Sequence, residues 1–370
     1  MGRLVNIIRG AGVALLFLLI ALCLAITILP PFLDRIYYDG PVSRHYDGAR
    51  FFNPDGEIDA PAPPGASRSG FIARYLLGDD DRLAWPEAIA VKPARPAPFA
   101  APRGMSATWV GHATVLVQAA GLNILTDPVW SERASPVSFA GPKRNNPPGV
   151  AFDDLPKIDI VIVTHNHYDH LDTATLRRLF RRDNPRIVTP LGNDTIMRDD
   201  MPGMVASVMD WADRIEIGKG VSIHCEPCHH WSARGMGDRR MALWAAFVIE
   251  TPGGKIYHIG DTGYAEGKHY REIRAKHGDI RLAIMPIGAY EPRWFMKAQH
   301  QNPEEAITGF RLSGAAFGIG HHFGTFQLTN EGIDDPPKAL AVAMSSAGIG
   351  NERFKGLRPG QQFEVPHADA

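Results

Sequence analysis

An apolar run that ends in a histidine cluster constrains the fold of this chain more than any other feature. Residues 158–164 (IDIVIVT) are mostly β-branched and apolar, which is typical of a buried strand. The chain then continues directly into His165, His167, Asp169 and His170. Alternate side chains of an extended chain point the same way, so the first two histidines can share one metal ion. The aspartate and the last histidine follow as the chain turns and face a second point. Such a density of donors argues against an ordinary polar loop.

A metal site of this kind needs further ligands, and three downstream residues fit. His230, Asp261 and His322 each stand at the end of a predicted strand, where a site at the edge of a sheet would form. Their neighbours His229 and His321 are weaker alternatives. Imidazole and carboxylate suit zinc, with iron or manganese as other divalent candidates.

Longer motifs surround these residues. They are THNHYDHLD at 164–172, His230-Trp231, GDTGY at 260–264, PIGAYEPRWFM at 286–296, QHQNPEEA at 299–306 and HHFGTF at 321–326. In this order they resemble the N-acyl-phosphatidylethanolamine-hydrolysing phospholipase D family of the metallo-β-lactamase superfamily. The resemblance covers residues 45–330.

The resemblance implies an α/β fold, the four-layer αβ/βα sandwich with two central mixed sheets flanked by helices. It also implies two zinc ions. The first would be held by His165, His167 and His230, and the second by Asp169, His170 and His322, with Asp261 bridging both.

The implied reaction is hydrolysis of N-acyl-phosphatidylethanolamine to N-acylethanolamine and phosphatidic acid. Two divalent ions can hold a hydroxide that attacks phosphorus and can offset the charge that grows on the phosphoryl oxygens. Asp169 and Asp261 are therefore the candidate catalytic residues, and Asp261 is hypothesised to orient the hydroxide.

Four residues outside the ligand set are candidate substrate contacts. They are Tyr168, Trp294, Gln299 and His300, with packing of a long loop as the alternative role. His112 and Asp127 are interpreted as supporting residues, the latter as an acid that orients a ligand histidine.

The N-terminus is predicted to be a membrane segment. Arg3 and Arg9 precede the uncharged apolar run 11–29, which is about long enough to cross a bilayer and is ended by Pro30-Pro31. The basic flank should stay in the cytoplasm. We therefore expect a single-pass protein of the cell inner membrane with a periplasmic catalytic domain. A cleaved signal peptide and a buried core helix are the alternatives.

Composition divides the chain into three expected segments. Residues 1–33 form the anchor or signal, 34–105 a Pro/Ala-rich extension that wraps the core, and 106–370 the catalytic domain. Helices are expected at 172–182, 267–277 and 303–312. Strands are expected at 114–118, 122–126, 158–164, 186–189, 214–217, 221–225, 243–250, 255–259, 282–286 and 316–320.

The net charge limits the kinds of partner that the chain can bind, and the cysteine content leaves several roles open. The chain has 39 basic and 40 acidic residues, a net charge of −1, so no nucleic-acid partner is expected. Cys225 and Cys228 leave three alternatives open: ordinary local residues, a disulfide, or direct functional chemistry. A homodimer is compatible with the resemblance.

The leading interpretation is thus a membrane-anchored zinc phosphodiesterase that acts on a membrane phospholipid. A hydrolase of the same fold acting on a lactone or a small phosphodiester is the first alternative, because fold does not fix chemistry. A membrane-anchored metal-binding protein without turnover is the second. The seven candidate ligands argue against it.

Overall fold

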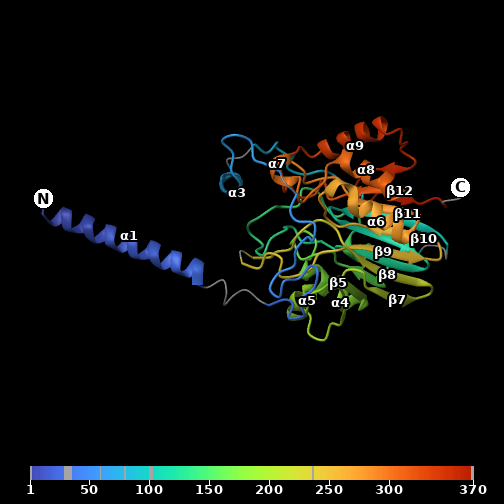
Figure 1. Ribbon diagram of the computed structural model, residues 1–370, viewed down its shortest axis with the longest axis horizontal. Helices are drawn as coiled ribbons and strands as arrows, with labels where there is room; N and C mark the ends of the chain where they lie inside the picture. Colours follow the sequence, from blue (N-terminus) through green and yellow to red (C-terminus); the bar gives the residue numbers. More distant parts are fainter. Residues whose placement is uncertain are drawn as a thin grey trace.

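Two β-sheets lie face to face between layers of helices (Figure 1). The computed structural model describes residues 2–28, 36–58, 60–78, 81–99, 103–235 and 237–367. Within these residues each sheet has seven strands. The expected four-layer arrangement is therefore confirmed.

The first sheet has the order β14-β1-β2-β3-β4-β5-β6. Strands β3 to β6 run parallel, and β14, β1, β2 and β3 pair antiparallel. The bounds are β1 (Met105–Gly111), β2 (Thr114–Ala119), β3 (Leu122–Thr126), β4 (Ile160–Ile162), β5 (Arg186–Pro190), β6 (Ala206–Met209) and β14 (Gln362–Glu364).

The second sheet has the order β13-β12-β11-β10-β9-β8-β7. Strands β10 to β13 run parallel, and β7 to β10 pair antiparallel. The bounds are β7 (Arg214–Gly218), β8 (Val221–Glu226), β9 (Ala246–Thr251), β10 (Gly254–His258), β11 (Ile280–Pro286), β12 (Ala315–His321) and β13 (Phe354–Lys355).

The core has two parts because strand side chains alternate between the faces of a sheet. In β4, Ile160 and Ile162 belong to the large cluster shared with the second sheet, whereas Val161 packs on the other face. That outer face is covered by α4 (Thr173–Asp183) and α5 (Asn193–Asp200). The second sheet is covered by α6 (Lys268–His277), α8 (Pro303–Leu312) and α9 (Asp335–Ser346).

The predicted helix starts agree with the cap chemistry. Asp172 caps α4 by accepting hydrogen bonds from the backbone of Ala174 and Thr175. Asn302 and Glu305 form a capping box at α8, with Pro303 at the first helical position as expected.

Several elements were not predicted from the sequence. They are β1, β6, β13, β14, α5 and α9, together with α7 (Arg293–Met296) and the short 3-10 helices Phe152–Asp154 and Ala265–Gly267. In β1, Ser106 and Thr108 are buried between apolar residues, so the strand lacks a clear alternation of polarity. The strand expected at 158–164 is paired only at Ile160–Ile162.

The extension before β1 contains one further element that the sequence did not indicate. Helix α3 (Arg68–Leu77) interrupts the segment interpreted as an extended arm. Other parts of the extension do lie along the core. The Ala94 amide donates to the Gly149 carbonyl at 2.7 Å, and Gln118 donates to the Ala97 carbonyl at 2.8 Å. The division of the chain into three segments stays a prediction.

Helix α1 (Gly2–Ile28) extends away from the two sheets (Figure 1). Its stretch Val5–Ala25 has a mean hydropathy of 2.5 and is not buried, so by length and composition it is a candidate membrane span. The helix break expected at Pro30-Pro31 and the boundary at residue 33 lie outside the described residues.

Candidate metal centre

The loops that follow four strands meet at one edge of the paired sheets. The 165–170 run follows β4, His230 follows β8, Asp261 follows β10 and His322 follows β12. Because β4, β10 and β12 are parallel members of their sheets, their carboxyl ends bring these loops together. All seven candidate ligands are thereby gathered in one buried cluster.

A first donor group consists of three imidazoles. His165 Nε2 lies 2.8 Å from His167 Nδ1, and His230 Nε2 lies 3.3 Å from the same atom. His165 and His230 are buried, while His167 is half-buried at the rim. These three nitrogens belong to the three histidines implied for the first zinc.

A second donor group contains a carboxylate. Asp169 Oδ2 lies 3.2 Å from His322 Nε2 and 3.6 Å from His170 Nε2. His112 joins this group, with its Nε2 at 2.8 Å from the same oxygen. His112 therefore supports Asp169, as expected, and is itself close enough to be a donor.

Asp261 lies between the two groups. Its Oδ2 is 3.0 Å from His322 Nε2 and 3.1 Å from His170 Nε2. The same oxygen is 3.9 Å from His165 Nε2 and 3.8 Å from His230 Nε2. This is the position that a bridging carboxylate requires.

Electrostatics differ between the two groups. Burial lowers the pKa of His165 well below its usual value, that of His167 to about 4 and that of His230 to about 3. These imidazoles are neutral lone-pair donors at pH 7.

In the second group the carboxylates raise the pKa of the histidines more than burial lowers it. Burial opposes a charge on His322, yet Asp261 and Asp169 raise its pKa to about 9. Burial likewise opposes a charge on His170, but the same acids raise its pKa as well. Two buried carboxylates thus attract positive charge at this point.

Outer partners fix which nitrogen faces inward. Asp127 is fully buried, and its Oδ2 lies 2.9 Å from His170 Nδ1. An ionised carboxylate can only accept, so Nδ1 carries a proton and Nε2 is the nitrogen that faces the donor cluster. The Thr164 hydroxyl donates to Asp127 and therefore accepts from His165 Nδ1 at 3.0 Å. Asp127 thus orients a donor histidine, as predicted.

His230 is oriented by the backbone. Its Nδ1 donates to the Gln299 carbonyl at 3.0 Å, which leaves Nε2 facing the other donors. The sequence missed this arrangement, because the partner is a main-chain group. It also missed Thr164 and His258, whose Nε2 lies 3.3 Å from Asp127.

The donor set fits divalent transition metals. Imidazole nitrogens and carboxylate oxygens are the usual ligands of zinc, and also of iron and manganese. Two atoms that face the carboxylates of the cluster, Nε2 of His170 and Nε2 of His322, are buried without a hydrogen-bond partner. Buried polar atoms are normally satisfied, so this cluster has the chemistry of a cation site.

Close packing under the site depends on a glycine. Gly260, immediately before Asp261, has φ +68°, and a Cβ there would lie 2.8 Å from the Thr164 side chain. A glycine at position 260 therefore permits this close approach. His322 also adopts a positive φ of 65°, which turns its side chain out of the β12 register.

In each of the two adjacent histidine pairs, 229–230 and 321–322, only the second histidine belongs to a donor group of the residues that the structure describes. His230 and His322 belong to donor groups, whereas His229 and His321 belong to none among the described residues. The His229 amide instead donates to Thr262 Oγ1, and the His321 ring is tilted by 45° to that of His258, with ring centroids 5.4 Å apart.

Of the four candidate substrate residues, His300 lies beside the cluster, whereas Trp294 packs against helix α3. His300 is buried beside the cluster and forms a possible donor group with His230 and Asp261. Its Nε2 lies 4.0 Å from Asp261 Oδ2, and its ring lies 5.2 Å from those of His230 and His322. Trp294 instead packs on Phe71 of α3, with ring centroids 5.8 Å apart.

Tyr168 and Gln299 have structural partners. The Arg234 guanidinium lies 3.8 Å from the Tyr168 ring, and Arg234 also donates to the Asn166 and Leu171 carbonyls. This clamp holds the metal-binding loop. Gln299 acts on His230 through its carbonyl, and its side-chain oxygen is buried without a partner.

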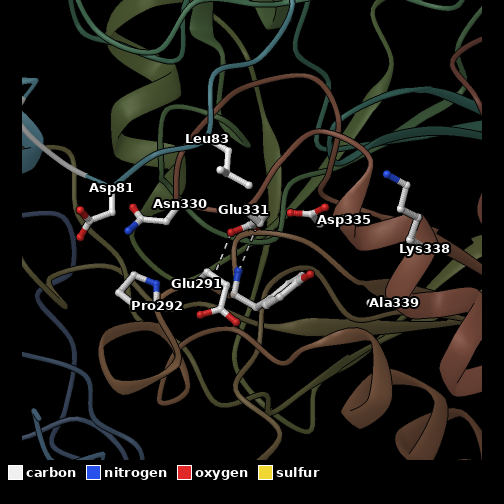
Figure 2. A pocket seen from close by; sticks show the side chains of 10 residues that line it. Asp81, Leu83, Glu291, Pro292, Asn330, Glu331, Asp335, Lys338 and Ala339 are labelled. Carbon is white, nitrogen blue, oxygen red and sulfur yellow. Dashed lines mark hydrogen bonds between the residues drawn. The ribbon is translucent and has the colours of Figure 1, made fainter.

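Three residues of the PIGAYEPRWFM segment, Tyr290, Glu291 and Pro292, line a cavity. Figure 2 shows Glu291 and Pro292 facing Glu331 and Asp335 around a pocket of about 530 Å³. Glu331 accepts the amides of Tyr290 and Glu291 and so holds the segment in place (Figure 2).

Another donor cluster lies outside this centre. His224, Glu226 and His277 approach one another, but Lys276 Nζ lies 2.7 Å from Glu226 Oε1 and already supplies the positive charge. We interpret it as an ion-pair network. Cys225 and Cys228 are buried free thiols, which rules out the disulfide alternative in this structure.

Comparison with known proteins agrees with this geometry. Residues 122–323 match the model of the β-lactamase superfamily domain, a range that contains all seven candidate ligands. The chain is 40% identical, over 67% of its length and 72% of the relative's, to N-acyl-phosphatidylethanolamine-hydrolysing phospholipase D 1 of Caenorhabditis elegans. It is 32% identical, over 65% of its length and 52% of the relative's, to the mitochondrial enzyme of that name from Saccharomyces cerevisiae.

A solved structure shares the fold. The isothiocyanate hydrolase from Delia radicum gut bacteria superimposes with a TM-score of 0.56 at 21% identity, covering 70% of this chain and 98% of that one.

Proposed function

The chain belongs to the β-lactamase superfamily and, within it, to the N-acyl-phosphatidylethanolamine-hydrolysing phospholipase D family, and from that premise we propose a two-zinc phosphodiesterase. It is a metal-dependent hydrolase. The observation that carries the finer proposal is the convergence of two donor groups on Asp261.

We assign the ligands by these groups. His165, His167 and His230 would hold one zinc, and Asp169, His170 and His322 the other, with Asp261 shared. When bound, the two ions supply a nucleophile from water at neutral pH and offset negative charge on the phosphoryl oxygens.

The chain's own residues prepare this chemistry. Asp127 and the Gln299 carbonyl hold His170 and His230 with their Nε2 atoms inward. His300, beside Asp261, is placed to contact the phosphoryl group of a substrate. Asp169 and Asp261 carry the negative charge that binds the cations and stay ionised, because the neighbouring histidines hold the pKa of each carboxyl well below its usual value despite burial.

The proposed substrate is N-acyl-phosphatidylethanolamine, and the products are N-acylethanolamine and phosphatidic acid. Support comes from the two relatives that are named for hydrolysis of this lipid and from α1, a candidate membrane span. An inner-membrane anchor with a periplasmic catalytic domain, and a homodimer, remain proposals of the same kind.

The test uses the full chain with its metal content measured. Purified protein is incubated with N-acyl-phosphatidylethanolamine, a small phosphodiester, a lactone and a β-lactam. We expect release of N-acylethanolamine plus phosphatidic acid. Turnover of the lactone alone would contradict the proposal and would indicate a lactone hydrolase instead.

Two adjacent histidines provide a matched control. His230→Ala should abolish lipid hydrolysis and lower metal content, as should His165→Ala. His229→Ala removes a neighbouring buried imidazole that lies in no donor group, so it should retain both. Equal loss in both members of the pair would contradict the ligand assignment.

A further inference from the structure

Residues 36–58 are the first described segment after α1, and they lie along the loop 230–242, which begins with a candidate metal ligand. The Phe51 amide donates to the Arg240 carbonyl at 2.7 Å, and the Phe51 side chain is buried in the large core cluster. The segment is therefore fixed against this loop by both main-chain pairing and core packing.

One contact from the segment reaches a candidate ligand directly. Asn53 is 6% exposed, and its Nδ2 donates to the His230 carbonyl at 3.1 Å. The ring of His230 is held separately, because its Nδ1 donates to the Gln299 carbonyl. Both the main chain and the side chain of His230 thus depend on partners that are distant in sequence.

A second contact acts through the turn 234–238. The Tyr37 hydroxyl donates to Asp238 Oδ2 at 2.8 Å. Asp238 is buried, and its carboxylate also accepts the Arg234 amide at 3.0 Å and the Gly235 amide at 2.8 Å. Asp238 therefore joins the segment to the turn from which the Arg234 side chain extends.

The Arg234 guanidinium carries this contact to the 165–170 run. Its Nη1 donates to the Asn166 carbonyl at 3.0 Å and to the Leu171 carbonyl at 2.8 Å. The first of these carbonyls lies between His165 and His167 in the chain. A planar guanidinium holds its acceptors in a fixed geometry, so a shift of the turn would be transmitted to the run.

The second donor group is supported from elsewhere. The ring of His170 is held by Asp127, and the His322 amide donates to the His112 carbonyl at 2.9 Å. None of these partners belongs to residues 36–58. The segment therefore bears mainly on the group that contains His167 and His230.

We propose that Tyr37 and Asn53 are positioning residues for the metal ion held by His165, His167 and His230. The affinity of that ion would then depend on the segment that follows α1, although no residue of the segment is a ligand. The proposal rests on the proposed function for the presence of a metal ion in this donor group.

Two adjacent tyrosines provide the test. Tyr37→Phe removes the hydroxyl that donates to Asp238 and keeps the ring. Tyr38→Phe is the matched control, because the Tyr38 ring packs edge-on against Tyr46 and its hydroxyl has no hydrogen-bond partner among the described residues. The full chain is loaded with zinc, and chelator competition measures the affinity of each ion.

We expect Tyr37→Phe and Asn53→Ala each to weaken one zinc about fivefold, the factor that one lost hydrogen bond contributes. The weakened ion should be the one that is lost in His230→Ala, and the other should keep its affinity. Tyr38→Phe should keep both affinities. Two unchanged affinities in both Tyr37→Phe and Asn53→Ala would overturn the proposal, as would equal losses in the two tyrosine variants.

A double variant separates positioning from general packing. Because Tyr37 acts through Arg234, Tyr37→Phe should cause no further loss of zinc affinity in an Arg234→Lys background. Additive losses would show that Tyr37 does not act through the guanidinium and would contradict the proposal. A wild type that binds a single zinc would contradict the two-metal function, and the same variants would still show whether that ion depends on residues 36–58.

Discussion

Replacing Asp127 by Asn should selectively weaken one of the two proposed metal positions. The Asp127 carboxylate accepts the Thr164 amide at 2.7 Å and the Thr164 hydroxyl at 2.9 Å, and it faces His170 Nδ1 at 2.9 Å. An amide in its place brings an NH2 group against one of these donors. His170 would lose the acceptor that fixes its tautomer and ring orientation.

The expected magnitude follows from such outer partners of metal ligands. Their loss typically weakens metal affinity by roughly 10–100-fold, which is about 1.4–2.7 kcal/mol. The metal held by the ligand group that contains His170 should lose this affinity. The affinity of the metal held by His167 and His230 should fall less. Chelator competition with metal analysis would then show one metal ion per chain that is bound tightly and one that is bound more weakly than in the wild type.

A control lies just before the neighbouring parallel strand β4, at the end of that strand away from the donor cluster. Asp159 accepts the Asn123 amide at 2.8 Å, far from the donor cluster in the chain fold, so Asp159→Asn should leave both metal ions tightly bound. Wild-type affinity for both metal ions in Asp127→Asn would refute the reasoning that this carboxylate prepares His170.

Three other outcomes are expected. Metal removal should lower the midpoint of thermal unfolding, because an ion that binds only the folded state stabilises it, and zinc should restore the midpoint in calorimetry. Lys276 and His277 hold the pKa of Glu226 below its usual value despite burial, so this acid stabilises the fold above about pH 4.3 and the effect is lost as pH falls through the folded-state pKa. Glu226→Gln should therefore be less stable by about 1.5–3 kcal/mol at pH 7, and denaturant titrations should show the difference shrinking in acid. Burial raises the pKa of the Cys225 and Cys228 thiols, so thiol reagents should label neither in the folded protein and both after denaturation, as counted by mass spectrometry.

Local pattern was enough to predict the frame of the molecule. A β-branched run followed by closely spaced donors predicts a buried strand that presents ligands, since both features depend on neighbours in sequence. The α8 cap was predictable for the same reason. Strands such as β1 and β14 were not, because their residues become buried only through pairing with distant segments.

The sequence by itself determined which donor types exist, and it predicted that His165 to His170 contribute to two half-sites. Only the tertiary structure decided how those halves are completed. The positive φ of His322 separates its direction from that of His321, and sheet register brings Asp261 between both groups. The tertiary structure also showed that the Gln299 carbonyl accepts a hydrogen bond from His230 and that Trp294 packs on α3. Side-chain direction depends on backbone angles and long-range packing, which residue spacing along the chain does not encode.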